Sequence, residues 1–147
     1  MQKQRGYSVV ALSQPKNSLN VGSALRAAHC YGADALVTSG IRYKTAPTDT
    51  QNAYKHVPYI RTNDLRETVP YSCVPVAIEI TDSSESLVDY IHPERAFYVF
   101  GPEDGSVSPS VLKWCRDVVG IPTSYCMNLA ATVNVVLYDR MAKGRRS

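Results

Sequence analysis

Asparagine, glycine and arginine residues in the segment 17–28 could bind an anion. Gly22 and Arg26 are four residues apart, so they share one face of a predicted helix that Asn20 caps. A glycine in the first turn costs up to about 1 kcal/mol relative to alanine, but it lets a phosphate or another backbone come close to Arg26. The free N–H groups at the start of the helix favour an anion at the same place. A capped surface helix with a solvated arginine is the alternative and, for this segment alone, the better explanation.

The segment 100–105, Phe-Gly-Pro-Glu-Asp-Gly, directly follows a predicted buried strand. Ligands of α/β folds bind at this carboxyl end of a strand, so a functional turn is expected here. Glu103 and Asp104 could accept hydrogen bonds from a ribose or pair with an arginine. An ordinary turn between a strand and a helix is the alternative. The sequence has no G-x-G-x-x-G pattern, so this turn is not a dinucleotide fingerprint.

A loop of small residues over 121–128 connects the last predicted strand to the last predicted helix. Its exposed backbone amides could bind the edge of an adenine ring. In the alternative interpretation, Asn128 only caps the helix that follows. Each of the three segments therefore has an ordinary explanation when it is considered alone.

Short apolar runs rich in β-branched residues alternate with helical patterns along the whole sequence. Strands are predicted over 7–12, 35–38, 74–80, 96–100 and 118–121, and helices over 20–31, 65–69, 85–90, 110–115 and 128–141. The polar segment 41–62 is predicted to be a long connection. Strands that alternate with helices are typical of the α/β class, with a mostly parallel sheet covered by helices on both faces.

Length and composition limit the class of protein. A chain of 147 residues without a linker or repeat predicts one domain over 1–147. No apolar run approaches the roughly 20 residues that span a bilayer, and no secretory signal is expected at the N-terminus. The four cysteines have no C-x-x-C spacing, which predicts reduced thiols in a cytoplasmic protein, three of them in the core, and no zinc site. The net charge of +3 permits a polyanionic partner.

The last predicted helix has two apolar stripes. One stripe contains Leu129, Val133, Val136 and Leu137, and the other contains Ala131, Val135 and Tyr138. A helix that is apolar on two sides needs two surfaces to pack against. One surface is the sheet of its own chain, and the other could be a second subunit. A helix deep in a single core explains the pattern equally well.

Taken together and in this order, the three segments resemble the SpoU/TrmH branch of the SPOUT superfamily, which contains RNA ribose 2′-O-methyltransferases that use S-adenosylmethionine. The family motifs are N-x-G-x-x-x-R, then F-G-P-E-x-x-G, then I-P followed by S-L-N. The residues that meet them are Asn20, Gly22, Arg26, Phe100 to Glu103, Ile121-Pro122 and Cys126-Met127-Asn128. The last glycine of the second motif comes one place early at Gly105, and Cys126 stands where the family has serine after a shorter loop.

The resemblance implies a C-terminal trefoil knot, a homodimer formed through the last helix, and S-adenosylmethionine held by the two knotted loops. The expected cofactor-binding residues are Ile78, Gly101, Glu103, Ile121, Cys126, Met127 and Asn128. It also gives Arg26 the role of activating the ribose 2′-hydroxyl. A guanidinium is a poor base near neutral pH, so we expect Arg26 to hold a phosphate or to stabilise the developing alkoxide.

Two further catalytic residues follow from the same resemblance. Asn20 is expected to orient Arg26 or the ribose, and Glu103 to fix Arg26, from the same subunit or from the other one. No metal is required, because the sulfonium already carries the reactive methyl group.

RNA contacts are expected from basic residues, mainly Arg42, Lys44, Lys55 and Arg61, and also Lys3, Arg5, Arg145 and Arg146. Such residues bind phosphates and give affinity without sequence choice, although a solvated surface explains any single one of them. Minimal members of the family often act on tRNA, so tRNA is the first expected substrate and rRNA the second. A catalytically silent RNA-binding protein, or a small nucleotide-binding α/β module, is the alternative. The intact motif residues Asn20, Arg26, Glu103 and Asn128 argue against a silent protein.

Overall fold

The computed structural model describes residues 6–40, 42 and 55–144. It contains a seven-stranded sheet in the order β3-β2-β1-β6-β4-β7-β5, in which every strand pair is parallel. The predicted α/β class with a parallel sheet is therefore confirmed. The predicted RNA contacts Lys3, Arg5, Lys44, Arg145 and Arg146 lie outside the described residues.

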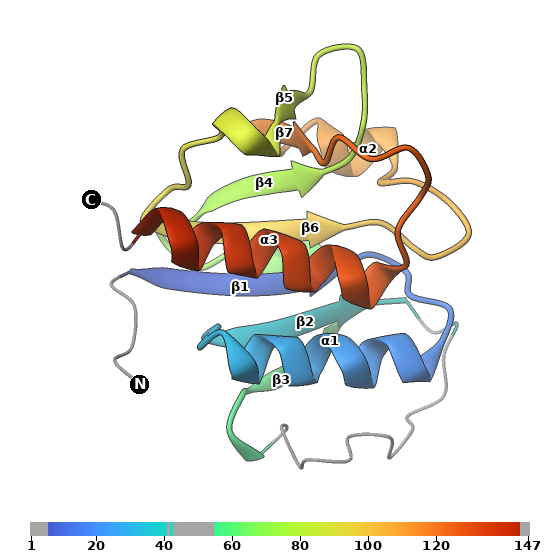
Figure 1. Cartoon of the computed structure of the whole chain (residues 1–147). Coiled ribbons are helices and arrows are strands. Elements are labelled where there is room, and N and C mark those ends of the chain that lie inside the picture. The colour runs from blue at the N-terminus through green and yellow to red at the C-terminus, as the bar shows by residue number, and fades with distance from the viewer. Residues whose placement is uncertain (1–5, 41, 43–54, 145–147) are drawn as a thin grey trace.

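The elements alternate along the chain (Figure 1). The strands are β1 Tyr7–Leu12, β2 Ala35–Ser39, β3 Tyr59–Thr62, β4 Val74–Ile78, β5 Glu85–Ser86, β6 Arg95–Phe100 and β7 Asp117–Gly120. The helices are α1 Ser18–Cys30, α2 Pro109–Leu112 and α3 Leu129–Gly144, with 3-10 turns at Leu65–Thr68 and Leu87–Asp89. Within the described residues, no helix has the length and apolar character needed to cross a membrane.

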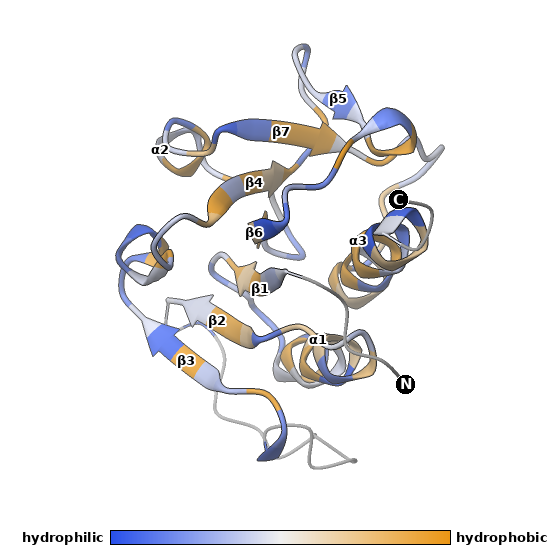
Figure 2. Cartoon of the chain, turned by 90° about the vertical axis from the view of Figure 1, so that its left-hand side faces the viewer, coloured by the Kyte–Doolittle hydropathy of each residue, from blue (hydrophilic) through white to orange (hydrophobic). Residues whose placement is uncertain are grey.

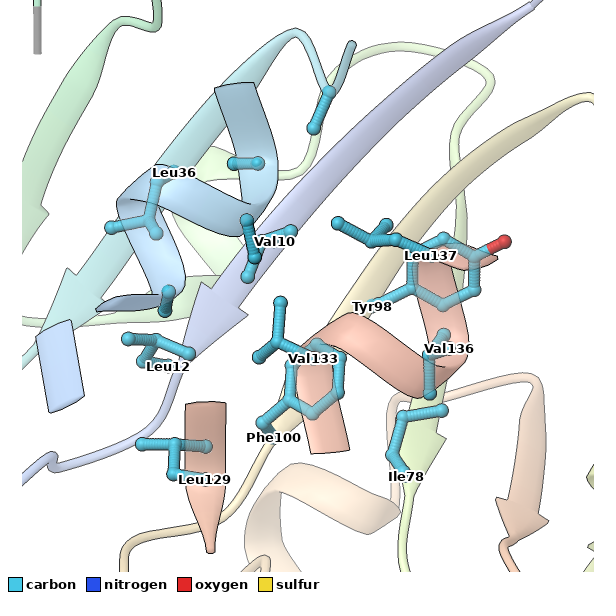
Figure 3. Packing of buried hydrophobic residues seen from close by; sticks show 14 of the residues in the cluster. Val10, Leu12, Leu36, Ile78, Tyr98, Phe100, Leu129, Val133, Val136 and Leu137 are labelled. Atoms are coloured by element: carbon cyan, nitrogen blue, oxygen red, sulfur yellow. The ribbon is translucent and has the colours of Figure 1, made fainter. Parts of the chain in front are cut away.

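Both faces of the sheet are covered, so its central strands are almost wholly apolar. The helices α1 and α3 lie side by side on one face, and α2 lies on the other (Figures 1 and 2). On the first face, side chains of β1 and β6 such as Leu12 and Phe100 pack against Val133 and Leu137 of α3 (Figure 3). On the other face, Phe97 of β6 packs near Trp114. This core fixes the strand ends that carry the predicted site.

Several predicted elements differ from the structure. The predicted strand 74–80 ends at Ile78, and the predicted helix 65–69 is a 3-10 turn over Leu65–Thr68. The segment 41–62 is not only a connection, because β3 pairs with β2 at its end. This edge strand is short and half of its residues are exposed, so it lacks the apolar run that marks a buried strand. The predicted helix 85–90 is strand β5 followed by a 3-10 turn that Ser86 caps. Helix α1 begins before Asn20, because Asn17 is its cap and accepts a hydrogen bond from the Leu19 N–H at 2.8 Å.

Polar side chains attach the end of α3 to the segment that precedes β6. The buried Arg140 guanidinium donates hydrogen bonds to the carbonyl oxygens of Pro93 and Glu94, each at 2.7 Å, and to the Tyr98 hydroxyl at 3.0 Å. His92 bridges the Tyr98 hydroxyl and the Asp139 carboxylate, each at 2.7 Å. These bonds fix the position of α3, whose first turn reaches the site described next.

Candidate active site

A cavity of about 190 Å³ lies at the carboxyl edge of the sheet, where β4, β6 and β7 end. Figure 1 shows the loops that follow these strands at the same edge. Its lining residues are Ile78, Glu79, Ile80, Phe100, Gly101, Pro102, Glu103, Gly105, Ile121, Thr123, Cys126, Met127, Leu129 and Thr132. The second and third predicted segments therefore meet in one cavity, as the sequence interpretation requires.

Most of the predicted cofactor-binding residues line this cavity. They are Ile78, Gly101, Glu103, Ile121, Cys126 and Met127. Asn128 is not among the lining residues, because its side chain caps α3 and accepts a hydrogen bond from the Ala131 N–H at 2.7 Å. For Asn128 the structure supports the simpler interpretation of a helix cap.

The loop after β6 turns back on itself at Gly101. A Cβ atom at this position would lie 2.8 Å from the Val107 nitrogen, so only glycine fits without a backbone shift. The Val107 N–H donates a hydrogen bond to Oε1 of the Glu79 carboxylate at 2.7 Å. We call residues 101–107 the motif loop. Its two ends are thus held together at the end of β4.

The Glu103 carboxylate connects the motif loop to the start of α1. Its Oε1 accepts a hydrogen bond from the Lys16 N–H at 2.8 Å, and its Oε2 accepts from the Asn17 N–H at 2.8 Å and from the Asn20 side-chain amide at 3.1 Å. Partial burial opposes ionisation, but these hydrogen bonds outweigh it, so the pKa of Glu103 lies below its ordinary value. The first and second motifs are therefore in direct contact.

Arg26 lies apart from this cluster. Its side chain is exposed on α1 and makes no hydrogen bond or ion pair with any residue that the structure describes. The Asn20 amide is directed to Glu103 and not to Arg26. The expected contacts of Arg26 with Asn20 and Glu103 are thus not formed within the described part of one chain, in which Asn20 and Glu103 contact each other.

The predicted RNA-binding residues within the described chain are all exposed. Arg42 donates a hydrogen bond to Asp104 of the motif loop at 2.6 Å, and this bond holds the pKa of Asp104 below its ordinary value. Lys55 precedes β3 and Arg61 lies on β3 at the edge of the sheet. Exposure leaves these cations accessible to phosphates, but it also agrees with a solvated surface.

The four cysteines are all free, as predicted. Cys73 is buried and Cys115 is partly buried, where burial raises the thiol pKa of Cys115 to about 12. Cys30 is exposed on α1, so its assignment to the core is wrong. Cys126 is exposed and lines the cavity. Among the described residues, no group of three or more His, Cys, Asp or Glu side chains is arranged to hold a metal ion.

The sequence interpretation missed Glu79. This carboxylate lines the cavity and holds the motif loop through Val107. Its position directly after the buried strand β4 is the same pattern that draws attention to the residues after β6. The predicted strand continues to residue 80, so Glu79 was expected inside the sheet and not in a loop at the site.

The fold and the cavity define a parallel α/β protein with a cavity built from three loops at the carboxyl edge of its sheet, where proteins of this class bind ligands. The sequence model of the SpoU rRNA Methylase family matches residues 7–138. The chain therefore belongs to this family, which confirms the resemblance drawn from the three motifs. No curated protein sequence matches the chain significantly.

Solved structures share this fold at low sequence identity. The SpoU methyltransferase AviRb from Streptomyces viridochromogenes superposes with a TM-score of 0.84 at 18% identity, over 97% of this chain and 62% of that chain. The A. aeolicus TrmH/SpoU tRNA modifying enzyme superposes with a TM-score of 0.85 at 19% identity, over 99% of this chain and 79% of that chain. A structure that addresses the 2-OH methylation of C/U34 on tRNA superposes with a TM-score of 0.82 at 21% identity, over 97% of this chain and 99% of that chain. The chain thus spans less than two thirds of AviRb but nearly the whole length of the last neighbour.

Proposed function

We propose that this chain is an S-adenosylmethionine-dependent RNA methyltransferase that methylates a ribose 2′-hydroxyl, with tRNA as the substrate. The observation that carries the proposal is the contact of Glu103 with the start of α1, which joins the cavity to the first motif. Family membership supports methyl transfer. AviRb has also been crystallised in complex with AdoMet, and two neighbours are described as acting on tRNA.

The cavity suits the proposed cofactor chemically. Ile78, Ile121, Met127 and Leu129 supply apolar walls for an adenine ring, and the carboxylates of Glu79 and Glu103 lie at the same cavity. When bound, the cofactor supplies a methyl group on a positively charged sulfur. The chain then has to position the ribose oxygen and exclude water, and such positioning lowers the barrier substantially.

Arg26 is proposed to hold a substrate phosphate or to stabilise the developing negative charge on the ribose oxygen. Its exposure and its lack of a partner within the described chain leave the guanidinium available for this role. A guanidinium donates two parallel hydrogen bonds, and this geometry fits a phosphate. A role as a proton acceptor would not use these donors. Arg42, Lys55 and Arg61 remain the proposed phosphate contacts outside the reaction centre.

A homodimer is part of the proposal, because the site of one chain lacks its arginine. A groove of about 440 Å³ follows the outer side of α3 and is lined mainly by apolar side chains, including Val88, Val135 and Tyr138. Tyr138 is 56% exposed on α3 and lies beside the exposed Val88 in this groove, so the two side chains form a contiguous apolar surface. A second copy seated on this groove would cover the outer stripe of α3 and bring a second Arg26 toward the cavity.

The trefoil knot is proposed from family membership and from the strand order. Strand β4 lies between β6 and β7, so the two cavity loops lie around its end before α3 begins. Four free thiols support a reducing compartment such as the cytoplasm. Ribosomal RNA is the second candidate substrate, because the family is described by rRNA methylation and a Sinorhizobium meliloti neighbour is an AdoMet-bound rRNA methyltransferase.

The test is transfer of a tritiated methyl group from S-adenosylmethionine to bulk tRNA and, separately, to rRNA. We expect label in tRNA, and mass spectrometry of the digested RNA is expected to find it as a 2′-O-methyl nucleoside. Label in rRNA alone would select the second substrate. Label on a base would contradict the ribose chemistry, and binding of RNA without transfer would favour the silent RNA-binding protein.

A further inference from the structure

Glu79 is a second carboxylate at the cavity, and no sequence motif includes it. It follows β4 directly, and its backbone N–H donates to the Val119 carbonyl oxygen of β7 at 2.9 Å. The residue is half-buried, and its side chain lies between the end of the sheet and the motif loop. The Glu79 backbone is therefore held against β7, and its side chain is held against the motif loop.

The Glu79 carboxylate has unused hydrogen-bonding capacity. An ionised carboxylate offers about four acceptor positions. Oε1 accepts from the Val107 N–H at 2.7 Å, and Oε2 accepts from the Ile80 N–H at 3.2 Å. No lysine or arginine in the described part of the chain pairs with it. A half-buried carboxylate beside apolar walls is costly to the fold unless donors satisfy it, so a ligand is the natural source of further donors.

The other two acidic residues near the cavity are already engaged. Glu103 accepts three hydrogen bonds from the start of α1, and Asp104 is bound by Arg42. From the sequence, these two carboxylates are the ones expected to accept hydrogen bonds from a ribose. Of the two carboxylates that line the cavity, Glu103 accepts three hydrogen bonds and Glu79 accepts two, so Glu79 retains more acceptor positions for that purpose.

We propose that Glu79 binds the ribose diol of the cofactor while it holds the motif loop through Val107. The two vicinal hydroxyls of a ribose are neighbouring donors that match the two oxygens of one carboxylate. This inference rests on the proposed S-adenosylmethionine cofactor but not on the RNA substrate or on methyl transfer.

The experiment measures ligand affinity by calorimetry, without RNA. The ligands are S-adenosylhomocysteine, 5′-methylthioadenosine, which lacks the amino acid part, and the 2′,3′-dideoxy form of 5′-methylthioadenosine. The proteins are the wild type, Glu79→Gln and the control Glu85→Gln, which removes an exposed carboxylate that does not line the cavity. The Glu79→Gln variant retains an amide oxygen for the Val107 N–H, and thermal unfolding without ligand checks that both variants are folded.

We expect Glu79→Gln to weaken both S-adenosylhomocysteine and 5′-methylthioadenosine by about tenfold, because a neutral acceptor replaces a charged one. The wild type should bind the dideoxy ligand about tenfold more weakly than 5′-methylthioadenosine, and Glu79→Gln should weaken it little further. Glu85→Gln should bind all three ligands as the wild type does.

Three results would overturn the proposal. A loss of affinity for S-adenosylhomocysteine but not for 5′-methylthioadenosine would assign Glu79 to the amino group. Equal binding of the dideoxy ligand and 5′-methylthioadenosine by the wild type would exclude a diol contact, even if the variant does not fold. A wild type that binds none of the ligands would refute the cofactor itself, whereas binding without RNA methylation would refute only the proposed reaction.

Discussion

Glu103 joins two segments that are far apart in the sequence. Its carboxylate accepts backbone hydrogen bonds from Lys16 and Asn17 and a side-chain bond from Asn20, so it acts as an anionic cap at the start of α1. Glu103 therefore has a positioning role, since these bonds determine where the motif loop lies relative to the first motif.

Glu103→Gln is therefore expected to lower the free energy of unfolding by about 1–2 kcal/mol, because it weakens hydrogen bonds to an ionised acceptor. Urea denaturation at neutral pH measures the change. The matched control is Glu67→Gln, an exposed residue of the 3-10 turn before β4, which should change stability by less than about 0.5 kcal/mol. Identical midpoints for wild type and Glu103→Gln would show that the capping bonds are not maintained in solution.

Arg26→Lys is expected to reduce methyl transfer by about 100-fold, because a lysine cannot reproduce the guanidinium fork at a phosphate or alkoxide. Affinity for S-adenosylhomocysteine should stay unchanged, since Arg26 does not line the cavity. Arg66→Lys, another exposed arginine, is the control and should leave both quantities unchanged. Equal losses of methyl transfer and cofactor affinity would mean that Arg26 belongs to the cofactor site.

The site could be predicted from sequence where local spacing determines it. Glycine at 101 and the residues after β6 and β7 were identified because strand ends are visible in the apolar pattern. The partners of Glu103 could not be predicted, because hydrogen bonds between residues that are far apart in the sequence leave no local pattern. The edge strand β3 was missed for the opposite reason, since its pattern is too short and too polar to distinguish from a loop.

Among the elements, α3 is held by a cluster of polar side chains near its C-terminal end. The His92 ring lies between Tyr98 and Asp139, and Arg140 and Lys143 of α3 and Tyr90 also surround it. Burial lowers the pKa of His92, although the Asp139 carboxylate opposes this effect. The folded chain thus favours the neutral imidazole, so His92 binds a proton less readily in the folded chain than in the unfolded chain.

This difference predicts a pH dependence of stability. The unfolded chain takes up a proton at His92 near pH 6.5, and the folded chain does so only at lower pH, so stability is lost as the pH falls below about 6.5. Urea denaturation between pH 7 and pH 5 should show a steeper loss for the wild type than for His92→Gln. A slope that is unchanged in His92→Gln would show that other groups cause the loss.

In the whole molecule, Arg26 lies on α1 and the groove lies along α3, and these two helices cover the same face of the sheet (Figure 2). In the proposed dimer, a second copy that packs on α3 would also approach α1, because α1 and α3 pack against each other. The proposed assembly would then supply partners for Arg26, which has none within the described part of its own chain.

Tyr138→Glu is expected to convert the proposed dimer to a monomer, because it places a charge in the apolar groove. Light scattering after gel filtration measures the mass. The monomer should lose methyl transfer but retain S-adenosylhomocysteine binding. Tyr71→Glu, at a tyrosine that is 94% exposed and outside the groove, should remain a dimer with full transfer. A monomeric wild type at micromolar concentration would contradict the assembly.

The cavity wall includes Leu129 and Thr132 from the first turn of α3, and the same helix covers the apolar faces of β1 and β6. A chain that is still being synthesised and has not reached α3 therefore has neither a closed core on that side nor a complete wall for a ligand. Its central strands β1 and β6 also pair between distant parts of the chain, a pairing that forms slowly. A ligand is consequently expected to bind only after α3 has packed on the sheet, and not at an earlier stage of folding.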